Sequence, residues 1–198
     1  MSRVIGLTGG IASGKSLVSH TLVGFGMMVI DADDIGRKIM ENDIKTKRRV
    51  VKTFGEEILR EDHEIDRKKL AMIIFSDPKK RELLESMLHP FIKREMRKKA
   101  LESSGDIVLE VPLLIEKGEH KRMDLVVVVY TSRDEQLRRL TSREGISMEE
   151  GIRRIATQLP LDEKISVAHY IINNSGSVEE TVEQVYRFHQ ILKEEKVP

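Results

Sequence analysis

Residues 4–16 read VIGLTGGIASGKS, and this stretch decides the fold. An apolar run from Val4 to Leu7 leads into a glycine-rich turn, and a helical pattern follows from about Lys15 to Val23. Residues 9–16 match the phosphate-loop pattern GxxxxGK[ST] in the context that the pattern requires, after a strand and before a helix. The sequence therefore predicts a nucleotide-binding loop at the end of the first strand.

Each part of this loop has a physical role. Glycine permits backbone conformations that other residues rarely adopt, so the N–H groups of the loop point into one concavity at a helix N-terminus, which favours a di- or triphosphate. The ammonium group of Lys15 reaches the β- and γ-phosphates, and the hydroxyl of Ser16 is suited to Mg²⁺. We therefore expect a nucleotide bound together with Mg²⁺.

Strand-like runs recur along the chain and alternate with helical patterns. The later runs cover Met27 to Ile30, Ile107 to Val111, Leu125 to Tyr130 and Tyr170 to Ile172. The run LVVVVY at 125–130 is β-branched without alternation, which suits a strand buried on both faces of a parallel sheet. This order indicates an α/β doubly wound fold, with the helical stretch from about 34 to 104 as an inserted lobe.

Local patterns also predict helices in the last third of the chain. Helical periodicity covers residues 133–144 and 148–159. Two capping boxes mark helix starts, Ser147 with Glu150 and Ser177 with Glu180, because a serine hydroxyl and a glutamate three residues later satisfy each other's backbone N–H groups.

Composition excludes several classes of protein. The 198 residues include 39% hydrophobic and 34% charged side chains with a formal net charge of +1, which favours one domain with a substantial core over a disordered or a DNA-coating protein. The absence of cysteine excludes disulfides, thiolate catalysis and cysteine-ligated zinc. No apolar run approaches the roughly 20 residues of a membrane span, so we expect a cytoplasmic protein without membrane or nucleic-acid partners.

Basic residues allow two interpretations. The runs at 45–49 and 93–99 are read first as solvated helix faces, and second as a positively charged wall for an anionic substrate. Arg138, Arg139 and Arg143 follow the fourth strand, and positions 139 and 143 share one helical face. Their guanidinium groups either close over a triphosphate as a lid or belong to an ordinary exposed helix.

A kinase also needs a group that orients the phosphoryl acceptor. Asp33 follows the second strand, where open α/β sheets place ligands, and its carboxylate would accept the proton of an acceptor hydroxyl. The alternative for Asp31 or Asp33 is helix capping, and the phosphate loop favours a functional role for at least one of them. Glu110, at a strand end, would reach Mg²⁺ through water.

Motifs along the whole chain resemble those of dephospho-CoA kinases, the family that completes coenzyme A synthesis. They are IGLTGGIASGKS at 5–16, VIDADDIGR at 29–37, IDRKKLAMIIFSDPKKRELLESMLHPFI at 65–92, VPLLIE at 111–116, QLRRLTSRE at 136–144 and IINNSG at 171–176. Many kinases share the phosphate loop, whereas DAD, Leu-His-Pro and Pro-Leu-Leu-Ile-Glu in this order are specific. The resemblance implies phosphorylation of the ribose 3′-hydroxyl of dephospho-CoA by ATP with Mg²⁺, in a monomer or small homo-oligomer.

The resemblance also implies a fold. It is a single P-loop kinase domain of three layers around a five-stranded parallel sheet. The core would cover about 1–40, 105–132 and 165–198. A helical substrate-binding insert would cover about 41–104, and a helical lid about 133–160.

Roles follow from the resemblance position by position. Asp33 would act on the ribose 3′-hydroxyl as base or orienter, with Lys15 and Arg143 as the other catalytic groups and Arg143 favoured for transition-state contact. ATP would be held by Gly10, Ala12, Ser13, Gly14, Lys15, Ser16, Leu17, Arg139, Arg143, Asn174 and Gly176. The acceptor would contact Asp33, Arg67, Phe75, His89, Pro90 and Leu113.

Some of these positions have structural alternatives. His89 either contacts the acceptor or caps a helix that Pro90 starts, and the run 113–115 is read more readily as packing than as chemistry. Two positions depart from the family pattern that the resemblance implies. His169 stands where many relatives carry Asp, and Ala12 stands where Gly is common, which alanine permits if the local φ is negative.

Two other functions remain open, a P-loop kinase of another small hydroxyl or nucleotide acceptor and a nucleotide-dependent switch protein. The long helical insert and the His-Pro segment argue against the first. A switch would need a guanine-reading Asn-Lys-x-Asp segment, and the sequence has none. A binding module without activity leaves Asp33 and the lid arginines without a purpose.

Overall fold

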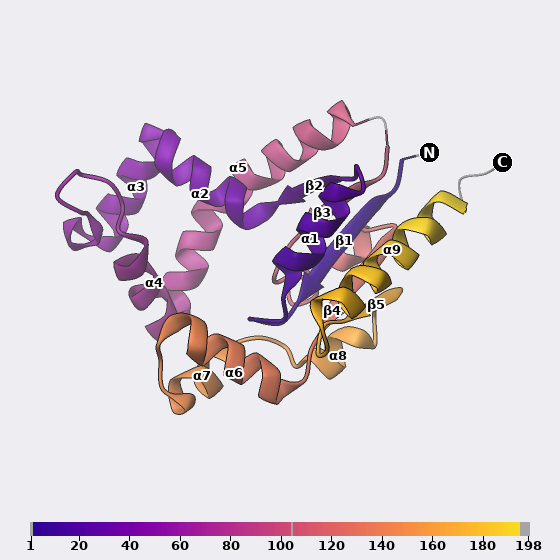
Figure 1. Cartoon of the computed structure of the whole chain (residues 1–198). Helices are drawn as coiled ribbons and strands as arrows, with labels where there is room; N and C mark the ends of the chain where they lie inside the picture. The colour runs from indigo at the N-terminus through magenta and orange to yellow at the C-terminus, as the bar shows by residue number, and fades with distance from the viewer. Residues whose placement is uncertain (1, 104, 195–198) are drawn as a thin grey trace. The chain divides into compact units, whose positions relative to one another are not determined.

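The computed structural model describes residues 2–103 and 105–194, without the side chains of Phe75 and Ala100. The chain forms two compact units, which Figure 1 shows in the colours of the chain order. The sheet unit comprises Met1–Ile30 and Ser103–Pro198, and the helical unit comprises Asp31–Glu102.

Five strands form one parallel sheet in the order β2-β3-β1-β4-β5. They are β1 (Val4–Gly9), β2 (Met28–Asp31), β3 (Ile107–Glu110), β4 (Leu125–Tyr130) and β5 (Tyr170–Asn173). The central strand β1 pairs with both neighbours at Gly6, which lies opposite Leu109 and Val126. The predicted α/β fold with a parallel sheet is confirmed.

Helices cover both faces of this sheet. The helices of the sheet unit are α1 (Lys15–Gly24), α6 (Arg133–Glu144), α7 (Met148–Ile155), α8 (Leu161–Ile165) and α9 (Val178–Glu194), with the 3-10 turn η2 (Glu119–Arg122). On one face Leu22 of α1 and Phe188 of α9 join the core, and Figure 1 shows both helices alongside the strands. On the other face Val126 and Val128 pack against Leu114 and Leu161. The valine run of β4 is therefore buried on both sides, as its sequence predicts.

Capping explains where the last helices begin. Before α9, the Ser177 N–H donates to Glu180 Oε2 at 2.9 Å and the Glu180 N–H donates to Ser177 Oγ at 3.1 Å, which is the predicted capping box. The prediction of one helix over 148–159 is wrong at its end, because α7 stops at Ile155. Pro160 follows closely, and a residue before proline is pushed out of the helical conformation.

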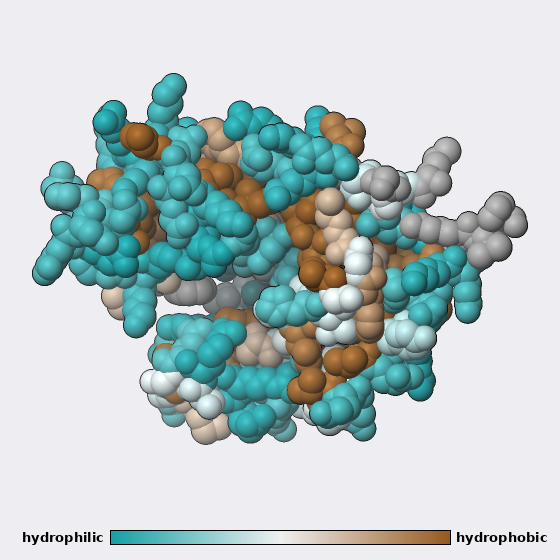
Figure 2. Space-filling model, turned by 45° about the horizontal axis from the view of Figure 1, so that its top comes forward, coloured by the Kyte–Doolittle hydropathy of each residue, from teal (hydrophilic) through white to brown (hydrophobic). Residues whose placement is uncertain are grey.

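The helical unit has its own hydrophobic core. Its elements are α2 (Ala32–Asn42), α3 (Ile44–Phe54), the 3-10 turn η1 (Glu56–Ile58), α4 (Arg67–Ser76) and α5 (Pro78–Glu102). Val50, Leu70 and Leu88 are among the buried residues that hold these elements together. The basic runs at 45–49 and 93–99 lie mainly on exposed helix faces, and hydrophilic side chains dominate the face drawn in Figure 2.

Pro90 does not start a helix, so the interpretation of His89 as a cap is wrong. Pro90 lies inside α5, which continues from Pro78 to Glu102. A proline leaves the carbonyl four residues earlier without its helical hydrogen bond. That carbonyl belongs to Ser86, and both Ser86 and Pro90 are exposed, so water can replace the lost partner.

Within the described residues, no helix is long and apolar enough to cross a bilayer.

Candidate active site

The phosphate loop joins β1 to α1 and contains two left-handed residues. Gly14, the residue before α1, has φ 92°, which glycine adopts without strain. Ala12 has φ 56°, so the condition of a negative φ, under which alanine would fit here without strain, is not met. An L-residue with a Cβ is strained in this region, and such strain persists only where surrounding contacts hold the backbone. The contacts around the loop supply that constraint.

Asn174, at the end of β5, fastens the loop from one side. Its Nδ2 donates to the carbonyl of Ser13 at 2.7 Å, and its Oδ1 accepts from the Thr181 hydroxyl at 2.8 Å, which fixes the orientation of the amide. A Cβ at Gly14 would lie 1.9 Å from the same Nδ2. Position 14 therefore requires glycine both for its backbone and for the room that Asn174 occupies.

Lys15 and Ser16 occupy the first turn of α1. The Lys15 ammonium donates to the carbonyls of Gly10 at 3.2 Å and Gly9 at 3.4 Å, so it lies folded over the loop. Ser16 is exposed, and its hydroxyl makes no hydrogen bond to the described residues. A cation on the loop and an open hydroxyl beside it are the groups that the phosphate-loop pattern predicts.

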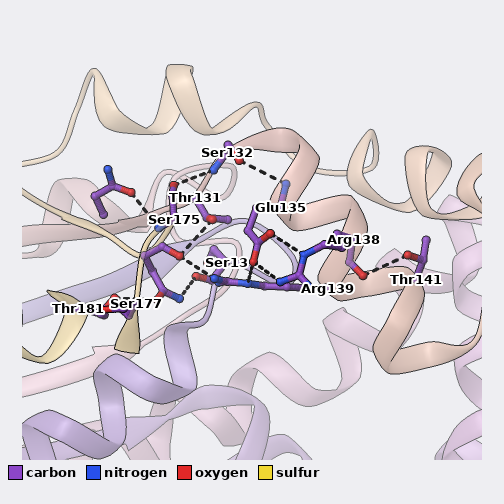
Figure 3. Close-up of polar contacts among 12 residues, drawn as sticks. Ser13, Thr131, Ser132, Glu135, Arg138, Arg139, Thr141, Ser175, Ser177 and Thr181 are labelled. Atoms are coloured by element: carbon purple, nitrogen blue, oxygen red, sulfur yellow. Dashed lines mark hydrogen bonds and ion pairs between the residues drawn. The ribbon is translucent and has the colours of Figure 1, made fainter. Parts of the chain in front are cut away.

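Arg139 links the lid helix α6 to the end of β5. Its Nη2 donates to the Asn174 carbonyl at 2.9 Å, and its Nε donates to Glu135 Oε1 at 2.7 Å. Arg138 binds the same carboxylate, and Figure 3 shows Glu135 between the two arginines. Hydrogen bonds from Arg138 and then from Arg139 lower the pKa of Glu135 to about 2 despite its partial burial. Arg143, about one turn after Arg139 on α6, has a side chain that is 60% exposed and pairs with Glu144 at 2.7 Å.

Several polar residues that the sequence reading missed surround the same loop. The side-chain amide of Gln136 donates to the Ile11 carbonyl at 2.7 Å, and the Ile11 N–H donates to Gln158 Oε1 at 2.8 Å. Further from the loop, the fully buried Lys164 forms an ion pair with Glu116 at 2.7 Å. None of these contacts has a local sequence signature, since the partners lie far apart in the chain.

The two predicted magnesium ligands, Ser16 and Glu110, differ in their surroundings. Glu110 is buried at the end of β3, and its carboxylate accepts a short hydrogen bond from Ser19 of α1, one turn after Ser16. Among the described residues no group of three or more His, Asp or Glu side chains could hold a metal by itself. Ser16 therefore fits Mg²⁺ that is shared with nucleotide phosphates, the usual mode for this ion.

Leu113 and Gly176 occupy structural surroundings as well. Leu113 is half-buried in the turn after β3, beside Leu114, which is fully buried in the core. Leu114 therefore has a packing role, as expected for the run 113–115. A Cβ at Gly176 would lie 2.0 Å from the Glu180 carboxylate, so this glycine leaves room for the capping box of α9.

The helical unit carries the predicted acceptor-side residues. Asp31 caps α2, because its Oδ1 accepts from the N–H groups of Asp33 at 2.8 Å and Asp34 at 3.2 Å. Asp33 is exposed in the first turn of the same helix. The capping alternative thus applies to Asp31. The side chain of Phe75 lies outside the described residues.

Arg67 begins α4 and lines a cavity of about 400 Å³ together with Arg37 and Arg60. The lining carries both charges, because Glu41, Glu64 and Asp66 are also part of it, and Arg37 and Arg60 form ion pairs with Asp34 and Asp62. His89 is half-buried in α5, next to the exposed Pro90. Arg67, His89 and Pro90 thus lie on helices of the helical unit, and their contact with an acceptor stays a prediction.

Comparison with known proteins gives the family. The family model described as dephospho-CoA kinase matches residues 3–180. The chain belongs to the dephospho-CoA kinase family. It is 47% identical over 186 residues to a protein named dephospho-CoA kinase from Carboxydothermus hydrogenoformans, covering 92% of this chain and 90% of that protein. The predicted family, its enzyme class as an ATP-dependent kinase and its place in coenzyme A synthesis are thereby confirmed.

Solved structures agree with this assignment. The structure of a dephospho-CoA kinase from Campylobacter jejuni is 27% identical with a TM-score of 0.71, covering 98% of this chain and 100% of that one. A shikimate kinase from Acinetobacter baumannii, solved with shikimate, is 18% identical with a TM-score of 0.56, covering 100% of this chain and 97% of that one. The second likeness shows a shared fold only.

His169 has a structural role. Its Nδ1 accepts the N–H of Val126 at 3.1 Å, and its own N–H donates to the Val126 carbonyl at 2.8 Å. The imidazole of His169, which directly precedes β5, therefore satisfies the N–H of Val126 near the start of β4. An Asp carboxylate is also an acceptor, so the resemblance's expectation of Asp at this position is compatible with the same backbone contact.

Proposed function

We propose that this chain transfers the γ-phosphoryl group of ATP to the ribose 3′-hydroxyl of dephospho-CoA, giving coenzyme A and ADP. The observation that carries the proposal is the phosphate loop with its ordered surroundings, in a chain that belongs to the dephospho-CoA kinase family.

The loop would bind the triphosphate through its N–H groups and Lys15. In the structure the Lys15 ammonium donates to two carbonyls of the loop, and bound β- and γ-phosphates would replace these weak acceptors with anionic ones. Ser16 would hold Mg²⁺ together with phosphate oxygens, with Glu110 acting through water. When bound, Mg²⁺ neutralises charge on the β- and γ-phosphates.

Asp33 would orient the 3′-hydroxyl and accept its proton during transfer. Since Asp31 caps α2, the first turn that presents Asp33 is fixed without using the Asp33 carboxylate for capping. Arg139 and Arg143 would contact the phosphates, and Arg143 would move from Glu144 to the transferred group. Arg67, Phe75, His89, Pro90 and Leu113 would contact the acceptor.

The experiment is ADP release from ATP and Mg²⁺ with dephospho-CoA, adenosine, AMP, shikimate, gluconate or no acceptor. Stimulation by dephospho-CoA alone, with a product of the mass of coenzyme A, is the expected result. Stimulation by another acceptor would retain the kinase and reject the acceptor. No stimulation in a folded protein that binds ATP would favour a switch protein.

Matched variants test the residue roles. Asp33→Asn should retain ATP binding while turnover drops by roughly 10²–10⁴-fold, because the proton acceptor is lost. Asp31→Asn is the control, since asparagine also caps helices and makes the same chemical change two residues away. Equal turnover in the two variants would remove Asp33 from the mechanism. Lys15→Ala should lose activity in a folded chain, and full activity would mean that Lys15 does not hold the phosphates.

The remaining expectations have their own tests. Chelation of Mg²⁺ should abolish turnover, and light scattering should find a monomer or a small homo-oligomer. The absence of cysteine supports action in the reducing cytoplasm, which cell fractionation would test.

A further inference from the structure

Two glutamines from opposite ends of the lid meet at one residue of the phosphate loop. Gln136 lies in the first turns of α6, and Gln158 lies between α7 and α8. Gln136 Nε2 donates to the Ile11 carbonyl at 2.7 Å, and the Ile11 N–H donates to Gln158 Oε1 at 2.8 Å. Both polar backbone groups of Ile11 are thus taken by side chains of the lid.

The chemistry of the backbone fixes how each amide must lie. A carbonyl only accepts and an N–H only donates, so Gln136 must present its nitrogen and Gln158 its oxygen. Gln136 is 5% exposed, and a Cβ at Gly10 would lie 2.3 Å from its Nε2. Gly10 therefore leaves the room that this buried amide needs. An unpaired amide in such a place would be destabilising, which makes the contact a constraint rather than a surface accident.

The second glutamine is held by its neighbour in the chain. The N–H of Leu159 donates to Glu116 Oε1 at 3.2 Å. Glu116 in turn pairs with Lys164, which is 0% exposed and also donates to the Pro112 carbonyl at 3.4 Å. The return segment of the lid is therefore fastened to the turn after β3 immediately beside Gln158.

The first glutamine shares a helix face with the lid arginines. Positions 136, 139 and 143 are three and four residues apart on α6, so their side chains lie along one side of the helix. A contact that fixes Gln136 to the loop therefore also fixes the rotation of α6 about its axis, and with it the direction in which Arg139 and Arg143 point.

We propose that Gln136 and Gln158 are positioning residues that form a clamp on the backbone N–H and carbonyl of Ile11. The Ile11 clamp rests on the proposed kinase function. It keeps the N–H and the carbonyl of Ile11 from turning toward the phosphates, so the phosphate-binding N–H groups are those that follow Ile11. It also makes Ile11 the fixed point from which α6 presents its arginines.

Exchanging glutamine for glutamate gives a matched test at the two positions. Glutamate keeps an acceptor oxygen but, when ionised, has no donor. Gln158→Glu should therefore retain most of kcat, whereas Gln136→Glu should lower kcat roughly ten- to hundredfold, the loss expected when a buried carbonyl faces a carboxylate. Gln136→Met and Gln158→Met, of similar volume and without either group, should both lower kcat with a smaller change in KM for dephospho-CoA. Equal losses in the two glutamate variants would overturn the clamp, since the added charge alone would then explain them.

A pH profile adds a readout that a merely structural role would not move. A carboxylic acid can donate when it is protonated, and the Ile11 carbonyl favours that form. The kcat of Gln136→Glu, taken as a ratio to the unsubstituted chain, should rise as the pH falls toward about 5. A ratio that stays flat in a folded variant would count against the donor role of Gln136.

Hydrogen exchange of the Ile11 amide tests the clamp without any activity. Exchange should be faster in Gln158→Met than in the unsubstituted chain and should return to the slow rate in Gln158→Glu. Unchanged exchange in Gln158→Met would refute the contact. A chain that fails to phosphorylate dephospho-CoA but shows this exchange pattern would reject the proposed function and retain the clamp.

Discussion

Ala12→Gly should stabilise the protein, although removing a side chain usually does the opposite. Ala12 has φ 56°, where the Cβ of an L-residue is crowded at a cost of about 1–2 kcal/mol. Glycine avoids this strain but gains conformational freedom in the unfolded chain, which destabilises by about 0.4–1 kcal/mol. The difference leaves a net gain of about 1 kcal/mol, which corresponds to a rise in Tm of about 2–4 °C for a chain of this length.

Thermal and urea unfolding would measure this change. Ala156→Gly is the control, since Ala156 ends α7 with φ −67°, a conformation that alanine adopts without strain. The control should lose up to about 1 kcal/mol, because only the entropy of the unfolded chain and the helix propensity change. Opposite signs in the two variants are therefore expected. A loss of the same size at both positions would refute the reasoning, because it would mean that Ala12 is not strained.

Three further predictions concern polar side chains. Glu116→Gln should lower the free energy of unfolding, measured in urea, by about 3–5 kcal/mol, because it leaves the fully buried Lys164 ammonium without its carboxylate. Lys164→Met should lower it by less, and the reverse order would contradict this. His169→Asp should keep the acceptor for the Val126 N–H, whereas His169→Ala should cost about 1 kcal/mol, and equal losses would deny that role. Burial, with Lys193 nearby, lowers the pKa of His189 below 6.5. The contribution of neutral His189 to stability should therefore be fully present above pH 6.5 and fall as the pH drops toward the lowered pKa. Tm measured against pH should lose this dependence in His189→Gln.

The parts of the fold that sequence predicts are those with a local cause. The valine run of β4 can be buried only between two layers, and the spacing of Ser177 and Glu180 already contains the contact that starts α9. The phosphate loop is likewise a local pattern of conformation and charge. In the capping box and the loop, the residues that interact lie within a few positions of one another. In β4 the partners are distant, but an unbroken valine run by itself requires a buried position.

Local rules fail where the surroundings offset a local penalty. Proline disfavours a helix interior, yet Pro90 lies within α5, where both it and Ser86, whose carbonyl loses its helical partner, are exposed to water. Alanine disfavours positive φ, yet Ala12 adopts it in a loop that Asn174, Gln136 and Gln158 hold from outside. Both misjudged positions follow from applying a propensity without the contacts that override it.

The polar contacts around the loop join residues that are far apart in the chain, so a single sequence does not predict them. Gln136 and Gln158 reach Ile11 from 125 and 147 positions away, and an isolated glutamine in a charged helix has no feature that distinguishes it from a solvated one. Motif residues were found because phosphate chemistry demands particular residue types, whereas a backbone peptide can be held by any donor and acceptor at the right place. Groups that touch a substrate are therefore easier to predict from sequence than groups that position them, because the substrate dictates the former and only the fold dictates the latter.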